Sequence, residues 1–395
     1  MELIPNIHCA CENEPKARFE CKNSPIDAGS YDYHSKRTFL TRPNNLMESV
    51  IHMLMCGLGG GLVAVHAAYM ECGLFIAMAM NVLLSALVGY CACILVWSAQ
   101  HLYGRVEMHE LTYPDVMEAA VLLSPWPTFR NTARGLRYLV EVTLICHLYG
   151  SCCVVIIIIA RNLKELGTGD GAISDGGNPS LKVIILCLMV PCAVICMITD
   201  LKNLAPFALV CDLFGVVLIL ALLWYSLHDI QDSPLDRSPY KSVMGLVQFT
   251  CICVFVLEPL CYALPIENNM KEPKKFHYVV LAAMPIITVA MLTVGFLGYW
   301  YYGEYSVAPI TVHFPFSSFA VTLKIFLCLS LYMVFTLCFY LGFDLQWYYL
   351  RRNHALSNYW FFERVYRIIH VVALTLIAYS VPNVTRMMGI LGAIT

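Results

Sequence analysis

Four glycines lie within five positions of one apolar run, where they could expose backbone hydrogen-bonding groups. The run reads C-G-L-G-G-G-L from Cys56 to Leu62, so the glycines are Gly57, Gly59, Gly60 and Gly61. Each glycine costs about 1 kcal/mol relative to alanine inside a helix. Either the helix unwinds here and its free N–H groups bind an anionic group, or the glycines form a small-residue face for close helix packing. The residues alone leave both interpretations open.

A second apolar run, Val243 to Pro265, has a carboxylate and a proline at its centre. Pro259 disrupts the local helix because it offers no N–H to the backbone ladder. Glu258 would be costly inside a membrane, so it is functional by default, although a neighbouring helix could instead satisfy it. The functional interpretation is a helix break in which carbonyls around Glu258–Cys261, with Glu258 itself near, bind a cationic group.

Other polar side chains are isolated within apolar runs: His52, His66, His147, Asp212, Lys324 and His370. We expect each histidine, apart from His52, to be a hydrogen-bonded structural residue, and Asp212 to be protonated or paired. The sequence has no H-E-x-x-H, Walker loop or G-x-S-x-G. We therefore predict no enzyme activity, no catalytic residues, no cofactor and no metal site.

The composition indicates what class of protein contains these apolar runs. Of 395 residues, 59% are hydrophobic and 13% charged, the net charge is −2 and the mean hydropathy is +0.67. A soluble domain has about 25% charged residues. The values exclude a soluble enzyme, a nucleic-acid binder and a disordered chain. They indicate an all-α polytopic membrane protein.

Nine apolar runs are long enough to cross a hydrocarbon core of about 30 Å. They cover 47–69, 74–99, 138–160, 182–199, 205–226, 243–265, 278–302, 319–343 and 364–382, and a tenth begins near Arg386 and stops at Thr395. We predict a transmembrane domain over 46–395 with nine complete spans and a partial tenth. The segment Thr112–Val121 between two of the runs predicts a short interfacial or intracellular helix that starts near Pro114.

The distribution of Lys and Arg predicts the orientation. Six lie in the polar segment 1–45 and twelve in the connections that would share its side, against six on the opposite side. Because positive residues favour the cytosol, the N-terminus is predicted to be cytosolic and 1–45 a mostly disordered tail. Sixteen of the 19 cysteines lie in or at the ends of apolar runs, where cysteine packs as a small hydrophobe, so we expect no extracellular disulfide.

The segment Ile51–Leu62, I-H-M-L-M-C-G-L-G-G-G-L, resembles the first span of the proton-coupled amino acid transporters, within the amino acid/auxin permease family. Four other stretches agree: Y-P-D-V-M-E-A-A (113–120), C-C-V-x-x-I-x-I-A-R-N-L-K (152–164), L-K-N-L-A-P-F-A-L (201–209) and L-P-I-E-N-N-M-K-E-P-K-K-F (264–276). The last is the most specific, and the match is collinear from about residue 45 onward.

The resemblance implies a LeuT-like (APC-type) 5+5 inverted repeat in which spans 1 and 6 are discontinuous. It also implies symport of small neutral amino acids with a proton as the coupling ion. By position, His52 matches the family's proton-linked histidine, Gly59 and Gly61 its span-1 glycines, and Glu258 the acid in its F-E-G motif.

An amino acid substrate would place one charge at each predicted break. Both charges lose water on entry and need fixed partners. The N–H groups of Gly57–Gly61 suit the carboxylate, and the carbonyls around Glu258–Cys261 suit the ammonium. Tyr149 is predicted to cover the pocket as an aromatic lid.

Three residues depart from the family pattern: Cys56 and His66 in the first span and Pro259 in the sixth. They leave a second hypothesis, a non-transporting amino acid sensor or regulatory relative. The expected partners are small neutral amino acids and the lipid bilayer, with no nucleic acid; the sequence identifies no protein partner. We expect the plasma membrane, with a lysosomal or endosomal membrane as the alternative.

Overall fold

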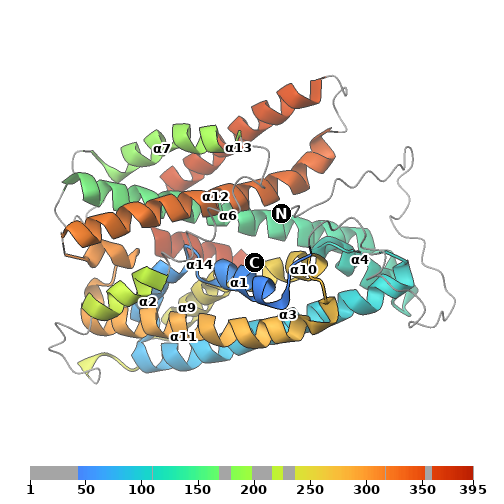
Figure 1. Ribbon diagram of the computed structural model, residues 1–395, viewed down its shortest axis with the longest axis horizontal. Helices are drawn as coiled ribbons and strands as arrows, with labels where there is room; N and C mark the ends of the chain where they lie inside the picture. The colour runs from blue at the N-terminus through green and yellow to red at the C-terminus, as the bar shows by residue number, and fades with distance from the viewer. Residues whose placement is uncertain are drawn as a thin grey trace. The chain divides into compact units, whose positions relative to one another are not determined.

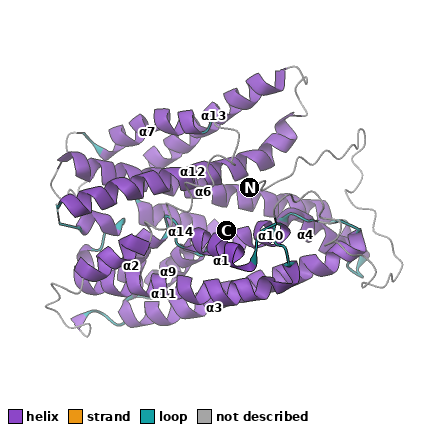
Figure 2. Cartoon of the chain, viewed as in Figure 1, coloured by secondary structure: helices purple, strands orange, loops and turns teal. Residues whose placement is uncertain are grey.

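In a computed structural model the described residues are 43–108, 110–168, 179–197, 216–225, 236–315, 317–351 and 358–394. Every regular element in these residues is a helix (Figure 2), and the only β-type pairing is an isolated bridge between Asn44 and Met270. The predicted all-helical class is confirmed. Most of the predicted tail and Asp212 lie outside the described residues.

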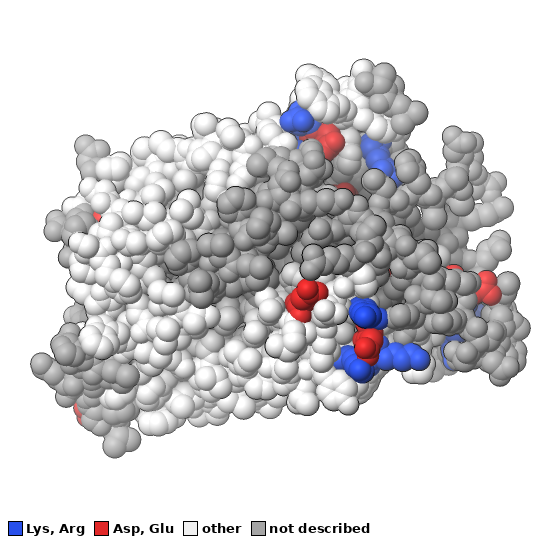
Figure 3. All heavy atoms as spheres, viewed as in Figure 1, with Lys and Arg blue, Asp and Glu red and all other residues white. Residues whose placement is uncertain are grey.

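Several helices are long and apolar enough to cross a membrane. The longest are α3 (Leu74–Val106), α6 (Ala133–Thr168), α11 (Phe276–Tyr302) and α12 (Ser318–Leu350). The described residues contain five such spans, or six if α13 (Tyr359–Ser380) and α14 (Val384–Ile394), which meet at 116°, form one. On the face in Figure 3, Lys, Arg, Asp and Glu occupy only a few small areas. These features are those of a polytopic membrane protein.

Two predicted spans are only partly described. The helix α7 (Leu181–Ile195) and the helix Val216–Tyr225 are apolar but shorter than a full span, and residues 198–215 between them lie outside the described part. The count of nine spans and the 5+5 repeat therefore stay predictions.

The helix is interrupted at both predicted breaks. The first apolar run contains α1 (Leu46–Gly57), a turn over 58–61, the 3-10 helix η1 (Leu62–Ala64) and α2 (Val65–Cys72). The second contains α9 (Val243–Val256) and α10 (Pro259–Asn268), separated by residues 257 and 258. Glycine and proline weaken a helix through their own backbones, which is why these breaks were predictable.

Short elements connect the long helices. They are α4 (Tyr113–Leu122), α5 (Pro127–Arg130), η4 (Pro273–Lys275), η5 (Gly303–Tyr305) and η6 (Ile310–His313). The short helix predicted near Pro114 is confirmed as α4. It begins with a capping box in which the Asp115 side chain accepts hydrogen bonds from the Thr112 N–H (3.2 Å) and hydroxyl (2.6 Å).

The chain forms two compact units. The first comprises Met1–Cys56, Ala86–Leu144 and Glu258–Ile286, and the second Gly57–Ser85, Ile145–Leu257 and Ile287–Thr395. In the first unit Arg137 pairs with Asp115 (3.1 Å) and Glu118 (2.5 Å), and the Tyr103 hydroxyl donates to Glu267 (2.8 Å). These contacts join α4 to α6 and α3 to α10, and the Asp115, Glu118 and Glu267 carboxylates each have a partner.

The second unit is built around α6. Its residues 151–160 are all buried, as expected of a helix that is surrounded on every side. In Figure 1, α7 lies beside α13, and α9 contacts both α2 and α14. Two glycines permit these contacts: a Cβ at Gly245 would clash with the Glu71 carbonyl, and a Cβ at Gly392 with the Cys251 carbonyl.

Candidate functional site

The first break is a tight turn rather than an extended loop. The Leu62 N–H donates to the Gly59 carbonyl and the Ala64 N–H to the Gly61 carbonyl, both at 3.1 Å, so the chain re-enters a helix through 3-10 bonds. Within the described residues of its unit, the Gly61 N–H has no acceptor at Gly57 or Leu58, where a helix would provide one. The break therefore presents at least one N–H that local backbone does not satisfy.

Packing explains why these positions are glycine. A Cβ at Gly61 would lie 2.9 Å from Val256 Cγ2, and a Cβ at Gly60 would lie 3.0 Å from Leu331 Cδ2 and 3.4 Å from Val155 Cγ2. A Cβ at Gly57 would clash with Ile287. Both interpretations of the glycine run thus have support, because the backbone is broken and is also closely packed.

The neighbour of Gly61 is the last helical residue before the second break. The helix α9 ends at Val256, and the Leu257 N–H donates to Cys253 at 2.9 Å. Pro259 has no N–H, so it cannot satisfy the Phe255 carbonyl four residues earlier. The Gly61 N–H of the first break and the Phe255 carbonyl of the second therefore lie in neighbouring parts of one compact unit.

One detail of the predicted cation site was wrong. We predicted free carbonyls around Glu258–Cys261, but the Glu258 carbonyl accepts the Cys261 N–H at 2.9 Å. Glu258 caps α10 and Pro259 occupies its first position, where proline is favoured. The tight turn satisfies the Glu258 carbonyl, so the acceptor that proline leaves open is that of Phe255. Glu258 and Cys261 themselves belong to the first unit.

Tyr149 lies against other helices. Its hydroxyl donates to Gln346 at 3.0 Å, and its ring centroid is 5.6 Å from that of His370. It precedes Val155 by six residues on α6, which is about 9 Å along the axis and about 120° around it. The structure thus places Tyr149 among α12 and α13; its role as a lid stays a prediction.

The histidines differ in their partners. His52 is half-buried on α1, in the first unit. His66 is fully buried with its Nε2 3.2 Å from the Val307 carbonyl, and His370 lies 2.7 Å from the Tyr366 carbonyl. His147 was wrongly expected to be hydrogen-bonded: it is 4% exposed, and neither ring nitrogen has a partner among the described residues.

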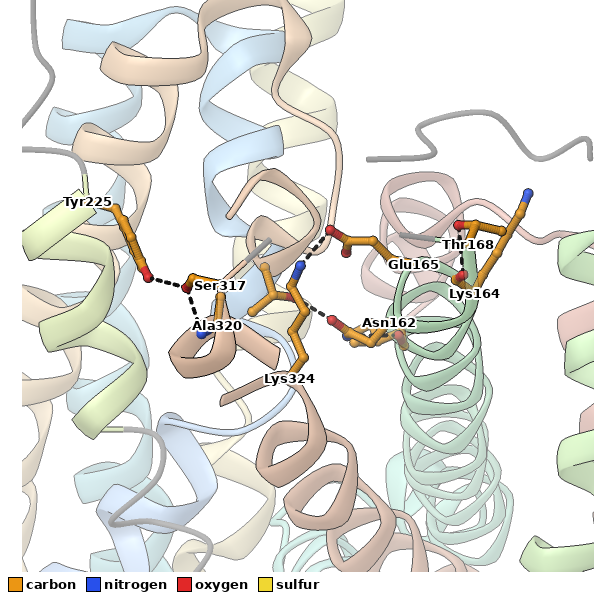
Figure 4. Close-up of polar contacts among 10 residues, drawn as sticks. Asn162, Lys164, Glu165, Thr168, Tyr225, Ser317, Ala320 and Lys324 are labelled. Carbon is orange, nitrogen blue, oxygen red and sulfur yellow. Dashed lines mark hydrogen bonds and ion pairs between the residues drawn. The ribbon is translucent and has the colours of Figure 1, made fainter. Parts of the chain in front are cut away.

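A second polar cluster lies at the C-terminal end of α6. Figure 4 shows Glu165 of α6 and Lys324 of α12 pointing toward one another, and their nearest atoms are 2.5 Å apart. Their side chains are 5% and 1% exposed. Asn162, three residues before Glu165, accepts a hydrogen bond from Thr311 at 2.6 Å.

Sequence reasoning identified Lys324 but missed Glu165. The predicted third span ended at residue 160, whereas α6 continues to Thr168. The spacing of Asn162 and Glu165 would have placed both on one helical face, provided that the helix had been extended.

Long apolar helices, two interrupted spans and buried polar groups define a helical membrane protein whose broken backbone lies inside the protein, as in transporters. Comparison with known proteins identifies the family. The family described as "Transmembrane amino acid transporter protein" matches residues 42–395, and the chain belongs to it. It is an integral, multi-pass membrane protein of an amino acid transporter family, whose members are not enzymes.

Two curated relatives carry the comparison further. The chain is 30% identical to "Proton-coupled amino acid transporter-like protein pathetic" of Drosophila melanogaster, across 89% of this chain and 74% of that protein. It is 26% identical to "Probable amino acid transporter skat-1" of Caenorhabditis elegans, across 81% of this chain and 70% of that protein. The resemblance seen in the sequence motifs is confirmed.

Proposed function

We propose that this chain is a secondary active transporter that carries small neutral amino acids together with protons. The observation that supports the proposal most directly is the packing of Gly61 against Val256. It brings the glycine turn, with the Gly61 N–H, to the end of α9, whose Phe255 carbonyl Pro259 cannot satisfy. A hydrogen-bond donor at one break and an acceptor at the other suit the carboxylate and the ammonium of a zwitterionic amino acid.

The carboxylate would be held by the N–H groups of Gly57–Gly61 and the ammonium by the carbonyls at the end of α9. Each charge then exchanges water for fixed backbone dipoles, which makes its burial tolerable. The names of the relatives support amino acids as the cargo, and the word "proton-coupled" in one name supports the coupling ion. His52 is proposed to carry the proton.

The proposed architecture is a LeuT-like repeat in which the broken spans are the first and sixth. We further propose a cytosolic N-terminus and the plasma membrane as the site of action. The sensor hypothesis has less support, because Pro259 begins α10 where proline is favoured and so leaves the second break intact.

The test is uptake into proteoliposomes that contain the purified protein. Radiolabelled glycine, alanine and proline are supplied with an acidic exterior, and uptake is compared with that at equal pH and with a protonophore. Symport predicts accumulation that needs the gradient. Binding of the same amino acids to detergent-solubilised protein, with no uptake by the proteoliposomes, would support the sensor instead.

A further inference from the structure

His147 is a buried polar side chain without a hydrogen-bond partner in the part of the chain that the structure describes. It is 4% exposed, and both Nδ1 and Nε2 are enclosed and unbonded. Buried polar atoms in native proteins almost always have partners, and those that do not call for an explanation such as a ligand or an ordered water. A neutral imidazole has one donor and one acceptor to offer.

The position of His147 indicates what that partner is. Its ring lies 5.2 Å from the ring of Phe255, centroid to centroid and tilted by 48°. Phe255 is the residue whose carbonyl Pro259 leaves without its helical donor. An unbonded imidazole and the residue whose carbonyl lacks its helical donor are therefore in side-chain contact at the C-terminal end of α9.

The same face of α6 also reaches the glycine turn. His147 and Val155 are separated by eight residues, which is about 12 Å along the axis and about 80° around it. Val155 Cγ2 would be 3.4 Å from a Cβ at Gly60. Through this face α6 contacts both the end of α9 and the first break, within one compact unit.

We propose that His147 is a substrate-binding residue, whose unprotonated ring nitrogen accepts a hydrogen bond from the ammonium of the bound amino acid. The proposal rests on the proposed transport function and adds to it a side chain that the backbone dipoles do not supply. An unprotonated ring nitrogen accepts a hydrogen bond, so it favours a cationic donor over an anion. The missing partner is then the substrate.

Substitution by phenylalanine separates a binding role from a structural one. Because the ring nitrogens make no bond in the protein, His147→Phe removes an unsatisfied polar group and should raise the Tm of the substrate-free protein by about 2 °C. The same variant should raise the KM for alanine uptake about tenfold or more, as expected on losing a hydrogen bond to a charged group. His147→Gln, which keeps an acceptor, should recover most of the affinity.

His66 provides the matched control. It is equally buried, but its Nε2 is bonded to the Val307 carbonyl, so His66→Phe should lower the Tm. Uptake by proteoliposomes and thermal stabilisation of the detergent-solubilised protein by alanine are measured for every variant.

An unchanged KM in His147→Phe, or a Tm that falls or a variant that does not fold, would overturn the proposal, since each shows a water-bonded or structural histidine. If the parent protein itself neither takes up nor is stabilised by amino acids, the proposed function fails instead. The two failures are therefore distinguishable.

Discussion

The glycines of the first break differ in how much room surrounds them. Gly60 faces the end of the flexible Leu331 side chain, whereas Gly61 faces Val256 down to its Cα, which would lie 3.3 Å from a Cβ. Close contact with backbone cannot relax by rotation of a side chain. Gly60 is therefore the position at which added bulk tests the site with the least damage to the fold.

We predict that Gly60→Val abolishes amino acid uptake and binding while it lowers stability by only about 1–3 kcal/mol, the usual cost of overpacking. Uptake and the Tm of the purified protein are measured together. Gly389→Val is the control, because its Cβ would meet no atom nearer than 3.9 Å. Amino acid binding by Gly60→Val equal to that of the parent would place the carboxylate site elsewhere.

At the same scale, His52 is the residue proposed to carry the proton. Among the side chains, imidazole changes its charge closest to neutral pH, which suits a proton carrier. We predict that His52→Ala removes the pH dependence of uptake and leaves surface expression unchanged. Uptake is measured between pH 5 and pH 8 beside the parent; a retained acid stimulation would assign His52 to structure.

Among the elements, α6 joins the helices of the second unit. Its C-terminal turn pairs with α12 through Glu165 and Lys324, both almost fully buried. Breaking a buried pair by removing one partner leaves an isolated charge, whereas removing both leaves an apolar contact. Removing one member of this ion pair should therefore destabilise the fold more than removing both members.

Lys324→Met should therefore lower the free energy of unfolding by about 3–5 kcal/mol, and Lys324→Met with Glu165→Leu should recover most of the loss. Thermal unfolding in detergent measures both. The exposed pair Lys241–Glu304, at 2.6 Å with side chains 25% and 63% exposed, is the control; Lys241→Met should cost no more than about 1 kcal/mol. A double variant as unstable as Lys324→Met would contradict this, because it would show that the ion pair stabilises the fold more than an apolar contact does.

For the whole molecule, the distribution of Lys and Arg predicts which side of the membrane each connection faces. A cysteine introduced at Lys274 should react with an impermeant thiol reagent only after the cells are opened. One introduced at Ser174, outside the described residues, should react in intact cells, with the parent as the background. The reverse pattern would invert the topology and remove the argument for the 5+5 repeat.

The sequence determined the features that depend on local chemistry. Composition established a helical membrane protein, and the Gly57–Gly61 run and Pro259 located both helix breaks, because glycine and proline alter the backbone at their own positions. The motifs at Ile51–Leu62 and 264–276 identified the family. The charge of Lys324 inside an apolar run was likewise visible without a fold.

Only the tertiary structure decided which groups meet. Glu165 can pair with Lys324 because α6 extends past residue 160, and the Tyr149 hydroxyl donates to Gln346. His147, which the sequence predicted to be a structural histidine, has no partner among the residues described. Hydrogen bonds and close packing join residues far apart in the chain, and in a sequence where most neighbours are apolar the local pattern cannot specify which of them come into contact.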